Sequence, residues 1–129
     1  MALGQGDQIE LRVSPDAYVT VRYAGASGDF NPIHIDEEYA RAVGLPARIL
    51  HGLWSMAQVA RAATGLAGED PTALRSLSVQ FRGMGRIGEE IVVSGEVKSV
   101  ADGIATAKLE AVQGGTRLIR NGIAELRAD

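Results

Sequence analysis

The octet SGDFNPIH, residues 27–34, brings a carboxylate, an amide and an imidazole into one short stretch. Pro32 cannot continue a helix and pushes the residue before it toward extended conformations, so the backbone between Asp29 and His34 has few choices. Such a stiffened arm could direct the Asp29 carboxylate and the His34 imidazole at one small molecule, such as a water. The simpler interpretation is a turn, because Asp and Asn side chains readily bond to nearby backbone groups.

A second candidate group lies at the start of a nearly all-apolar segment, HGLWSMAQVARAATG. A helix that is apolar on almost every side is a buried one, so we expect a central helix over residues 51–65. Gly52 allows close approach to the backbone, and the first N–H groups of a helix are unpaired at the positive end of its dipole. These groups could form an oxyanion hole; alternatively, Gly52 only permits a tight turn. His51 could be a second imidazole in the site, but we favour a structural histidine at this turn.

Helical signals fill the first half of the chain. Ser14-Pro15-Asp16 has the capping hydroxyl, the proline and the early acid that are typical of a helix start. The residues that follow, from Ala17 to Tyr23, also alternate as in a strand, but the start signal favours a helix. We expect, in chain order, a strand at Gln8–Val13, a helix from about 14 to 28, a short helix at Asp36–Val43 and the buried helix.

Strand signals fill the second half, where apolar and polar residues alternate after Pro71. Asp102-Gly103 is a strong hairpin signal, Gly114-Gly115 indicates another turn, and Gly122 indicates a bulge. The expected strands are 76–81, about 89–100, 105–111 and 116–126. This order favours the α+β class, with an antiparallel sheet curled round one buried helix. Because one sheet covers only one side of that helix, we expect a partner subunit on the other side.

Composition limits the classes of function. The length of 129 residues fits a single domain, 1–129, with one core. A net charge of -3 and a pI of about 5.4 disfavour nucleic-acid binding, which is normally basic. The absence of cysteine excludes disulfides and cysteine nucleophiles. Since we find neither a secretory signal nor an apolar run of about 20 residues, we expect no membrane association and a cytoplasmic location.

The segment YAGASGDFNPIHIDEEYA, residues 23–40, closely resembles the signature of the MaoC-like (R)-specific enoyl-CoA hydratases, also called hydratase 2. The segment LHGLW, residues 50–54, resembles the start of that family's central helix. The resemblance extends over nearly the whole chain in the order of its elements. It implies a hot-dog fold, in which a curved antiparallel β-sheet wraps a long central helix, normally in dimers. We therefore expect a homodimer, with a heterodimer as the alternative.

The resemblance also implies a reaction and its residues. Asp29 and His34 match the catalytic dyad, and Asn31 matches the amide that positions the dyad or its water. Gly52 matches the glycine whose N–H binds the thioester oxygen. The implied activity is reversible hydration of trans-2-enoyl thioesters to (R)-3-hydroxyacyl thioesters, carried by coenzyme A or acyl carrier protein. It implies no cofactor.

The chain departs from the family's pattern in two places. Some relatives have a serine in the central helix where this chain has Ala60, and Ser55 lies earlier in the helix. The segment from Phe81 to Glu89 is rich in glycine where relatives often have F-x-x-P-V-x-x-G-D. The glycines could loosen this loop by the substrate entrance, which bears on the choice of substrate more than on the chemistry. Arg82 and Arg86, in the same segment, are candidates for binding the phosphates of coenzyme A.

Three alternatives stay open from the sequence. A metal site could in principle be built from Asp29, His34, His51 and Asp36, but only the residue types support it and we expect no metal. A hot-dog thioesterase would commonly use an acid on the central helix, and residues 51–65 contain none. The chain could also be a partner-dependent or non-catalytic subunit of a heteromeric dehydratase.

Overall fold

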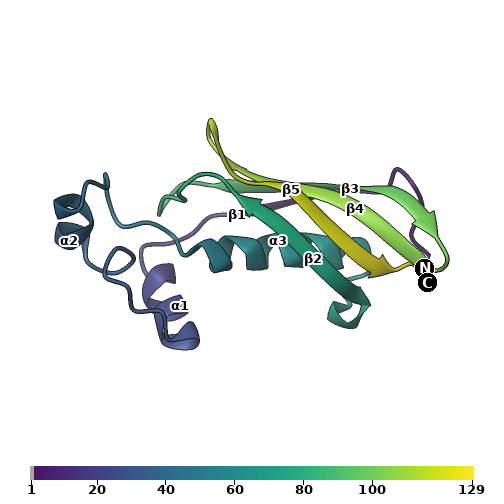
Figure 1. The fold of residues 1–129 in the computed structure, drawn as a ribbon, viewed down its shortest axis with the longest axis horizontal. Coiled ribbons are helices and arrows are strands. Elements are labelled where there is room, and N and C mark those ends of the chain that lie inside the picture. The colour runs from purple at the N-terminus through teal and green to yellow at the C-terminus, as the bar shows by residue number, and fades with distance from the viewer. Residues whose placement is uncertain (1) are drawn as a thin grey trace.

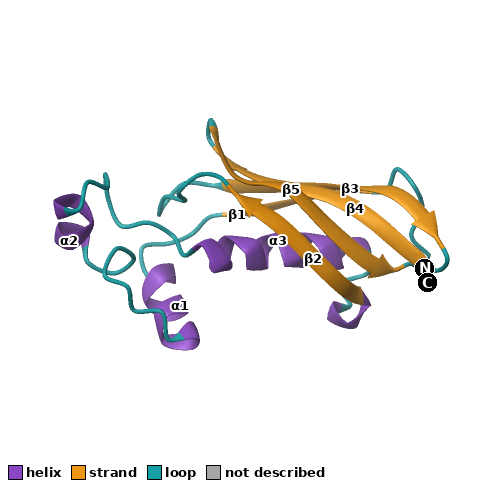
Figure 2. Ribbon diagram, in the orientation of Figure 1, coloured by secondary structure: helices purple, strands orange, loops and turns teal. Residues whose placement is uncertain are grey.

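A long helix lies along one face of a curved antiparallel sheet, and two short helices lie beyond one end of it (Figure 1). The computed structural model describes residues 2–129. Figure 2 separates the strands from the helices and from the loops that join them. The elements are β1 (Gln8–Val13), α1 (Val19–Ser27), α2 (Glu37–Ala42), α3 (Gly52–Leu66), the 3-10 turn η1 (Pro71–Ala73), β2 (Leu74–Phe81), β3 (Ile91–Ala101), β4 (Ile104–Gln113) and β5 (Thr116–Arg127).

The sheet has the order β1-β3-β4-β5-β2, and every neighbouring pair is antiparallel. The predicted hairpin at Asp102-Gly103 is confirmed, and both residues have positive φ, as a type I′ turn requires. The bulge predicted at Gly122 is also present, because the pairing of β4 with β5 shifts register beside it. A Cβ at Gly122 would lie 2.8 Å from the Leu109 carbonyl oxygen, so glycine is required for this close approach.

The core lies between α3 and the sheet, and α3 packs against all five strands. Alternate residues of β3 point inward, with Val93 and Val97 fully buried. The inward side chains of β4 are mostly alanine, such as Ala107 and Ala111, which lets the helix approach closely. The predicted buried helix is therefore confirmed, and so is the α+β class. No helix within residues 2–129 combines the length and the hydropathy of a membrane span.

The helix predicted from Ser14-Pro15-Asp16 starts later than expected. Strand β1 ends at Val13 and α1 begins only at Val19. The Asp16 carboxylate accepts a hydrogen bond from the Tyr18 N–H at 2.7 Å, which forms a turn before the helix. The Pro15 carbonyl accepts a hydrogen bond from the Gly88 N–H at 2.8 Å. That long-range contact holds the proline in a loop, so a tertiary contact overrides the local helix signal.

Helices α1 and α2, with the loops around them, form the end of the molecule that carries the octet 27–34 (Figure 1). As predicted, Asp36 caps α2, and its carboxylate accepts from the Tyr39 N–H at 3.0 Å. Arg48 joins the two helices, because its N–H and its Nε donate to Glu37 of α2 while Nη1 donates to the Thr20 hydroxyl of α1 at 3.4 Å. Hydrogen bonds from the Arg48 backbone, and then from its side chain, lower the pKa of Glu37.

Candidate active site

His34 is held in a buried turn by a contact with a distant segment. Its side chain is only 9% exposed, and Nδ1 lies 2.8 Å from the Ile49 carbonyl oxygen. A carbonyl oxygen only accepts, so Nδ1 carries the proton and donates it. In the neutral ring Nε2 is then left with a free lone pair. The fold therefore leaves Nε2 of His34 as a proton acceptor, on the opposite side of the ring from the bond to Ile49.

Asp29 faces that free nitrogen. Gly28 ends α1 with φ 80° and bonds back to the Ala24 carbonyl, which turns the chain so that Asp29 leaves the helix. Asp29 Oδ2 lies 3.9 Å from His34 Nε2. That separation is too long for a direct hydrogen bond, and it suits two groups that share one small molecule between them. Asp29 is about half exposed, whereas His34 is buried, so the pair lies at the boundary between the protein surface and its interior.

Asn31 organises the turn between the two. Its N–H donates to Asp29 Oδ1 at 3.2 Å, and its side-chain oxygen accepts from the Ile33 N–H at 3.2 Å. The His34 N–H in turn donates to the Asn31 carbonyl at 3.0 Å. Asn31 thus orients the Asp29 carboxylate and closes the turn that carries His34. The predicted turn is therefore present and places Asp29 close to His34. That the two side chains act on one molecule stays a prediction.

His51 contacts both members of the pair. Its ring stacks on the His34 ring with centroids 3.8 Å apart and an angle of 22° between the planes. Its Nε2 lies 3.1 Å from the Asp29 carbonyl oxygen and donates to it. Nδ1 is buried without a hydrogen-bond partner within residues 2–129, and the Tyr23 ring packs nearby at 4.8 Å. His51 thus joins the turn before α3 to both Asp29 and His34, and its structural role stays a prediction.

Gly52 is the first residue of α3, and its N–H therefore has no acceptor inside the helix. Two hollows meet at this residue and at the Phe81 ring. The outer cavity, about 330 Å³, is lined by Asp29 and His51 as well, and the inner cavity, about 180 Å³, by His34. A molecule at Gly52 would thus lie where a cavity lined by Asp29 adjoins one lined by His34.

The structure brings Asp29, His34 and Gly52 to two adjoining cavities, and Asn31 lies in the turn beside Asp29. The two predicted arginines line neither cavity. Arg86 lies in an ion pair with Glu89, 2.7 Å from its carboxylate, and also donates to the Gln113 carbonyl at 3.2 Å. That hydrogen-bonded ion pair lowers the pKa of Glu89 and raises that of Arg86. Arg86 therefore has a structural task, and its role in binding substrate stays a prediction.

The inner cavity is also lined by three residues that the sequence analysis mentioned without giving them a role in the site: Ser55, Phe81 and Met84. Ser55 is 5% exposed and lies one helical turn after Gly52, and that spacing was the available signal. Ala60, by contrast, lines neither cavity. Phe81 is the last residue of β2 and Met84 lies in the loop after it, so only the fold could place them beside the start of α3.

The one group of three possible metal ligands among residues 2–129 is Asp29, His34 and His51, whose ligand atoms lie within 4.8 Å of one another. Asp36, the fourth residue considered from the sequence, caps α2 instead. Two ring nitrogens of the histidines already bond to backbone carbonyls. That no metal takes part stays a prediction.

Comparison with known proteins agrees with this geometry. Residues 5–117 match the MaoC like domain family. The chain belongs to this family. It is 34% identical over 110 residues to the fatty acid synthase beta subunit aflB of Emericella nidulans, covering 80% of this chain and 5% of that one. It is 33% identical over 88 residues to the enoyl-CoA hydratase ChsH3 of Mycobacterium tuberculosis, covering 67% and 30%. The MaoC-like chain thus spans less than a third of the length of these relatives.

Solved structures confirm the hot-dog fold. A chain of the ChsH1-ChsH2 complex from Mycobacterium tuberculosis superposes with a TM-score of 0.87 at 25% identity, covering 98% of both chains. The (R)-hydratase from A. caviae involved in PHA biosynthesis superposes with a TM-score of 0.82 at 25% identity, again covering 98% of both. The predicted family and the predicted architecture are both borne out.

Proposed function

We propose that this MaoC-like domain catalyses the reversible hydration of trans-2-enoyl thioesters to (R)-3-hydroxyacyl thioesters. The observation that carries the proposal is the placement of Asp29 and His34, 3.9 Å apart, beside two cavities that share Gly52, the first residue of α3. The names of two similar proteins, an enoyl-CoA hydratase and an (R)-hydratase, support the reaction and its stereochemistry. Neither a cofactor nor a metal has a place in the proposed reaction.

The geometry suggests the order of events. Asp29 and His34 hold one water between them, and His34 Nε2 takes a proton as the water oxygen bonds to C3 of the substrate. The electron pair of the C2–C3 double bond moves toward the thioester oxygen, which becomes an enolate at the Gly52 N–H. The imidazolium then returns a proton to C2, and the sum is one water added. Positioned acid–base groups supply about 10²–10⁴-fold, and one oxyanion donor contributes on the order of 3 kcal/mol.

The decisive experiment follows loss of ultraviolet absorbance as crotonyl-CoA is hydrated. The variant His34→Asn replaces the ring with an amide that can still donate to the Ile49 carbonyl but has no equivalent of Nε2. The variant Asp29→Asn keeps the size of the side chain and removes its charge. Each should lower kcat/KM by about 10²–10⁴-fold with little change in unfolding temperature. If both variants keep the wild-type rate, the pair is not the catalytic dyad.

A second candidate is a subunit that needs a partner. Its support is the likeness to a chain of a two-component complex and an exposed stripe on α3 in which Leu53 is 62% exposed. We propose that a second subunit, a copy of this chain in the first instance, covers that side of the helix. Light scattering would measure the assembly. Activity that arises only when another chain is added would favour the heteromeric form.

A thioesterase is a weaker candidate, because α3 contains no acidic residue. Hydrolysis would release a free thiol, whereas hydration leaves the thioester intact. A thiol reagent added to the crotonyl-CoA reaction separates the two activities in one assay. A cytoplasmic location and the absence of nucleic-acid or membrane binding stay predictions.

A further inference from the structure

The inner cavity has two polar side chains among its lining residues, His34 and Ser55. The other residues that line it are apolar or glycine. Ligand pockets typically have this character, with a few polar groups that fix the orientation of the ligand. The reaction proposed above gives His34 a task, but it leaves the Ser55 hydroxyl without one.

Ser55 is buried, and its hydroxyl has no partner in the protein. The residue is 5% exposed, and its hydroxyl forms no hydrogen bond with any residue from 2 to 129. A serine in a helix often bonds to the carbonyl four residues earlier. Here that carbonyl belongs to His51, and it already accepts from the N–H groups of Trp54 at 3.1 Å and of Ser55 itself at 3.3 Å. Since a carbonyl oxygen has two lone pairs and an unpaired buried hydroxyl is costly, we expect a molecule in the cavity to supply the missing bond.

The helix directs this hydroxyl toward Gly52. Side chains of an α-helix tilt toward its N-terminus, and residues three positions apart lie on the same face. Ser55 comes three residues after Gly52, the first residue of α3, and both line the inner cavity. The Gly52 N–H has no acceptor inside the helix. This N–H and the Ser55 hydroxyl therefore adjoin the same space, at the positive end of the helix dipole.

The hydroxyl is placed to act as a hydrogen-bond donor and not as a nucleophile. A serine nucleophile needs a base within hydrogen-bond reach. His34 Nδ1 donates to the Ile49 carbonyl, and Nε2 faces Asp29 Oδ2 at 3.9 Å. Within residues 2–129, neither ring nitrogen of His34 is hydrogen-bonded to Ser55. Ser55 therefore keeps its proton and can share it with an acceptor.

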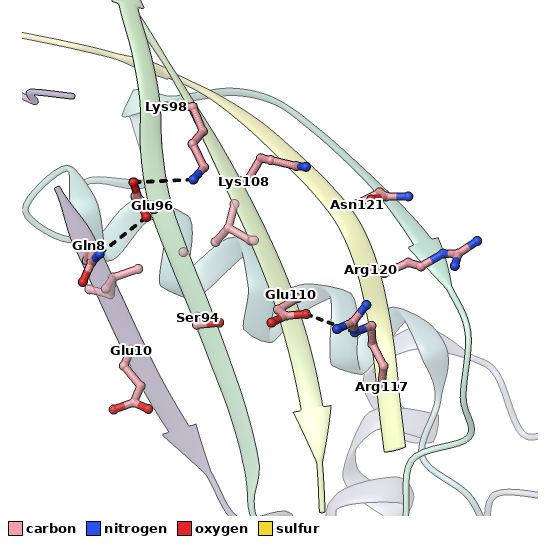
Figure 3. Close-up of a pocket in the computed structure, with 13 residues that line it drawn as sticks. Gln8, Glu10, Ser94, Glu96, Lys98, Lys108, Glu110, Arg117, Arg120 and Asn121 are labelled. Atoms are coloured by element: carbon pink, nitrogen blue, oxygen red, sulfur yellow. Dashed lines mark hydrogen bonds and ion pairs between the residues drawn. The ribbon is translucent and has the colours of Figure 1, made fainter. Parts of the chain in front are cut away.

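A hollow on the outer face of the sheet also contains a serine, and it differs in character. It has a volume of about 700 Å³ and lies over β1, β3, β4 and β5. Figure 3 shows Ser94 in this hollow among charged side chains, where Lys98 pairs with Glu96 at 3.5 Å and Arg117 with Glu110 at 3.0 Å. The hollow shares no residue with either cavity of the candidate active site. Ser94 therefore offers a hydroxyl that is separate from the reactive groups.

We propose that Ser55 is a catalytic residue whose hydroxyl is the second hydrogen-bond donor to the thioester oxygen, beside the Gly52 N–H; the inference rests on the hydration of thioesters proposed above. As the water oxygen bonds to C3, the electron pair of the C2–C3 double bond moves toward the thioester oxygen, and both donors bind the enolate that forms. The proton stays on the serine oxygen throughout, so the sum is still one water added. Because the oxygen carries more negative charge in the transition state than in the substrate, both hydrogen bonds strengthen as the reaction proceeds.

The first test removes the donor in two ways and measures hydration of crotonyl-CoA. Ser55→Ala deletes the hydroxyl, whereas Ser55→Cys keeps the shape of the side chain and has only a weak donor. Each should lower kcat about 10²-fold with little change in KM or in the unfolding temperature. Ser94→Ala is the matched control, because it deletes the same group from a serine that lines neither cavity, and it should leave kcat and KM unchanged. The proposal is wrong if Ser55→Ala behaves like Ser94→Ala, if Ser55→Cys keeps the wild-type kcat, or if KM alone rises.

The second test observes the thioester carbonyl itself. Infrared difference spectra are recorded for crotonyl-CoA, isotopically labelled at the carbonyl carbon, bound to the slow variant Asp29→Asn. A hydrogen bond to the carbonyl oxygen weakens the C=O bond, so the stretching frequency should fall on binding. Adding Ser55→Ala to this variant should return the frequency part of the way to its value in solution. A frequency that Ser55→Ala leaves unchanged would refute the proposal, even where the variant has lost activity.

The role of Ser55 and the proposed function fail in different ways. Wild-type hydration of crotonyl-CoA together with an unchanged carbonyl frequency in the Ser55→Ala background overturns the role of Ser55 alone. If the wild type hydrates no thioester, the proposed function is wrong, and the carbonyl frequency of bound crotonyl-CoA still decides whether Ser55 donates to it. If crotonyl-CoA does not bind at all, both proposals are wrong.

Discussion

Replacing Gly52 by alanine tests whether the substrate passes the start of α3. A Cβ built on Gly52 would lie 3.3 and 3.4 Å from two ring carbons of Phe81. Both residues line both cavities, so the new methyl group would enter the space where the two meet. The N–H donor would remain, and the variant would change only the room beside it.

The expected cost falls on activity and not on stability. Phe81 is 51% exposed on the edge strand β2, so its ring can yield by a few tenths of an ångström. Alanine also favours a helix over glycine by up to about 1 kcal/mol, and we expect the free energy of unfolding to change by less than that. A misplacement of 1 Å can cost about 10²-fold in rate. A methyl group at the thioester should therefore lower kcat/KM about 10- to 100-fold.

The assay is steady-state hydration of crotonyl-CoA, with urea unfolding of the same preparations. Gly65→Ala is the control in the same helix. There the Cβ would meet the tip of Ile9 at 2.9 Å, away from both cavities, so stability can fall while the rate stays within twofold. A Gly52→Ala variant with the wild-type rate would refute the reasoning, because the thioester could not then lie at the Gly52 N–H.

Three further predictions concern the support of the site and its stability. Gln113 is fully buried and bonds to two backbone groups of Arg86 and one of Glu89. Gln113→Leu should therefore lower the free energy of unfolding by about 2–4 kcal/mol in urea titrations. An unchanged urea midpoint would contradict this prediction. His51→Phe keeps a ring beside His34 but removes the donor to the Asp29 carbonyl. In steady-state kinetics, kcat should fall about tenfold with KM nearly constant. An unchanged kcat would mean that His51 only fills space. The pKa of Glu37 lies below its ordinary 4.5 in the folded chain, so its contribution to stability is present above pH 4.5 and is lost as the pH falls below it. Acid titration should therefore destabilise the wild type more than Glu37→Gln. Parallel unfolding curves for the two proteins would argue against the Arg48 contact.

Local signals predicted those elements whose determinants lie close together in the chain. Asp36 caps α2 through its own carboxylate, and Asp102-Gly103 forms its turn through its own backbone angles. The start of α1 was predicted too early, because the contact that decides it joins Pro15 to Gly88. A sequence signal of a few residues carries no information about such a partner.

The sequence by itself determined which reactive groups the chain has and how stiffly they are linked. Pro32 and hydrogen bonds within the turn fix the relative positions of Asp29, Asn31 and His34. These positions therefore depend on neighbouring residues alone. Only the tertiary structure decided which nitrogen of His34 is free, because the Ile49 carbonyl that takes the other proton lies 15 residues away.

The fold alone likewise placed Phe81 beside Gly52 and paired the end of β2 with β5. Both depend on how the sheet curves round α3, which is a property of the packed core and of no single segment. Hydrogen bonds within a turn can be read from neighbouring residues. Contacts between strands and helices form only when the whole core excludes water and brings distant segments together.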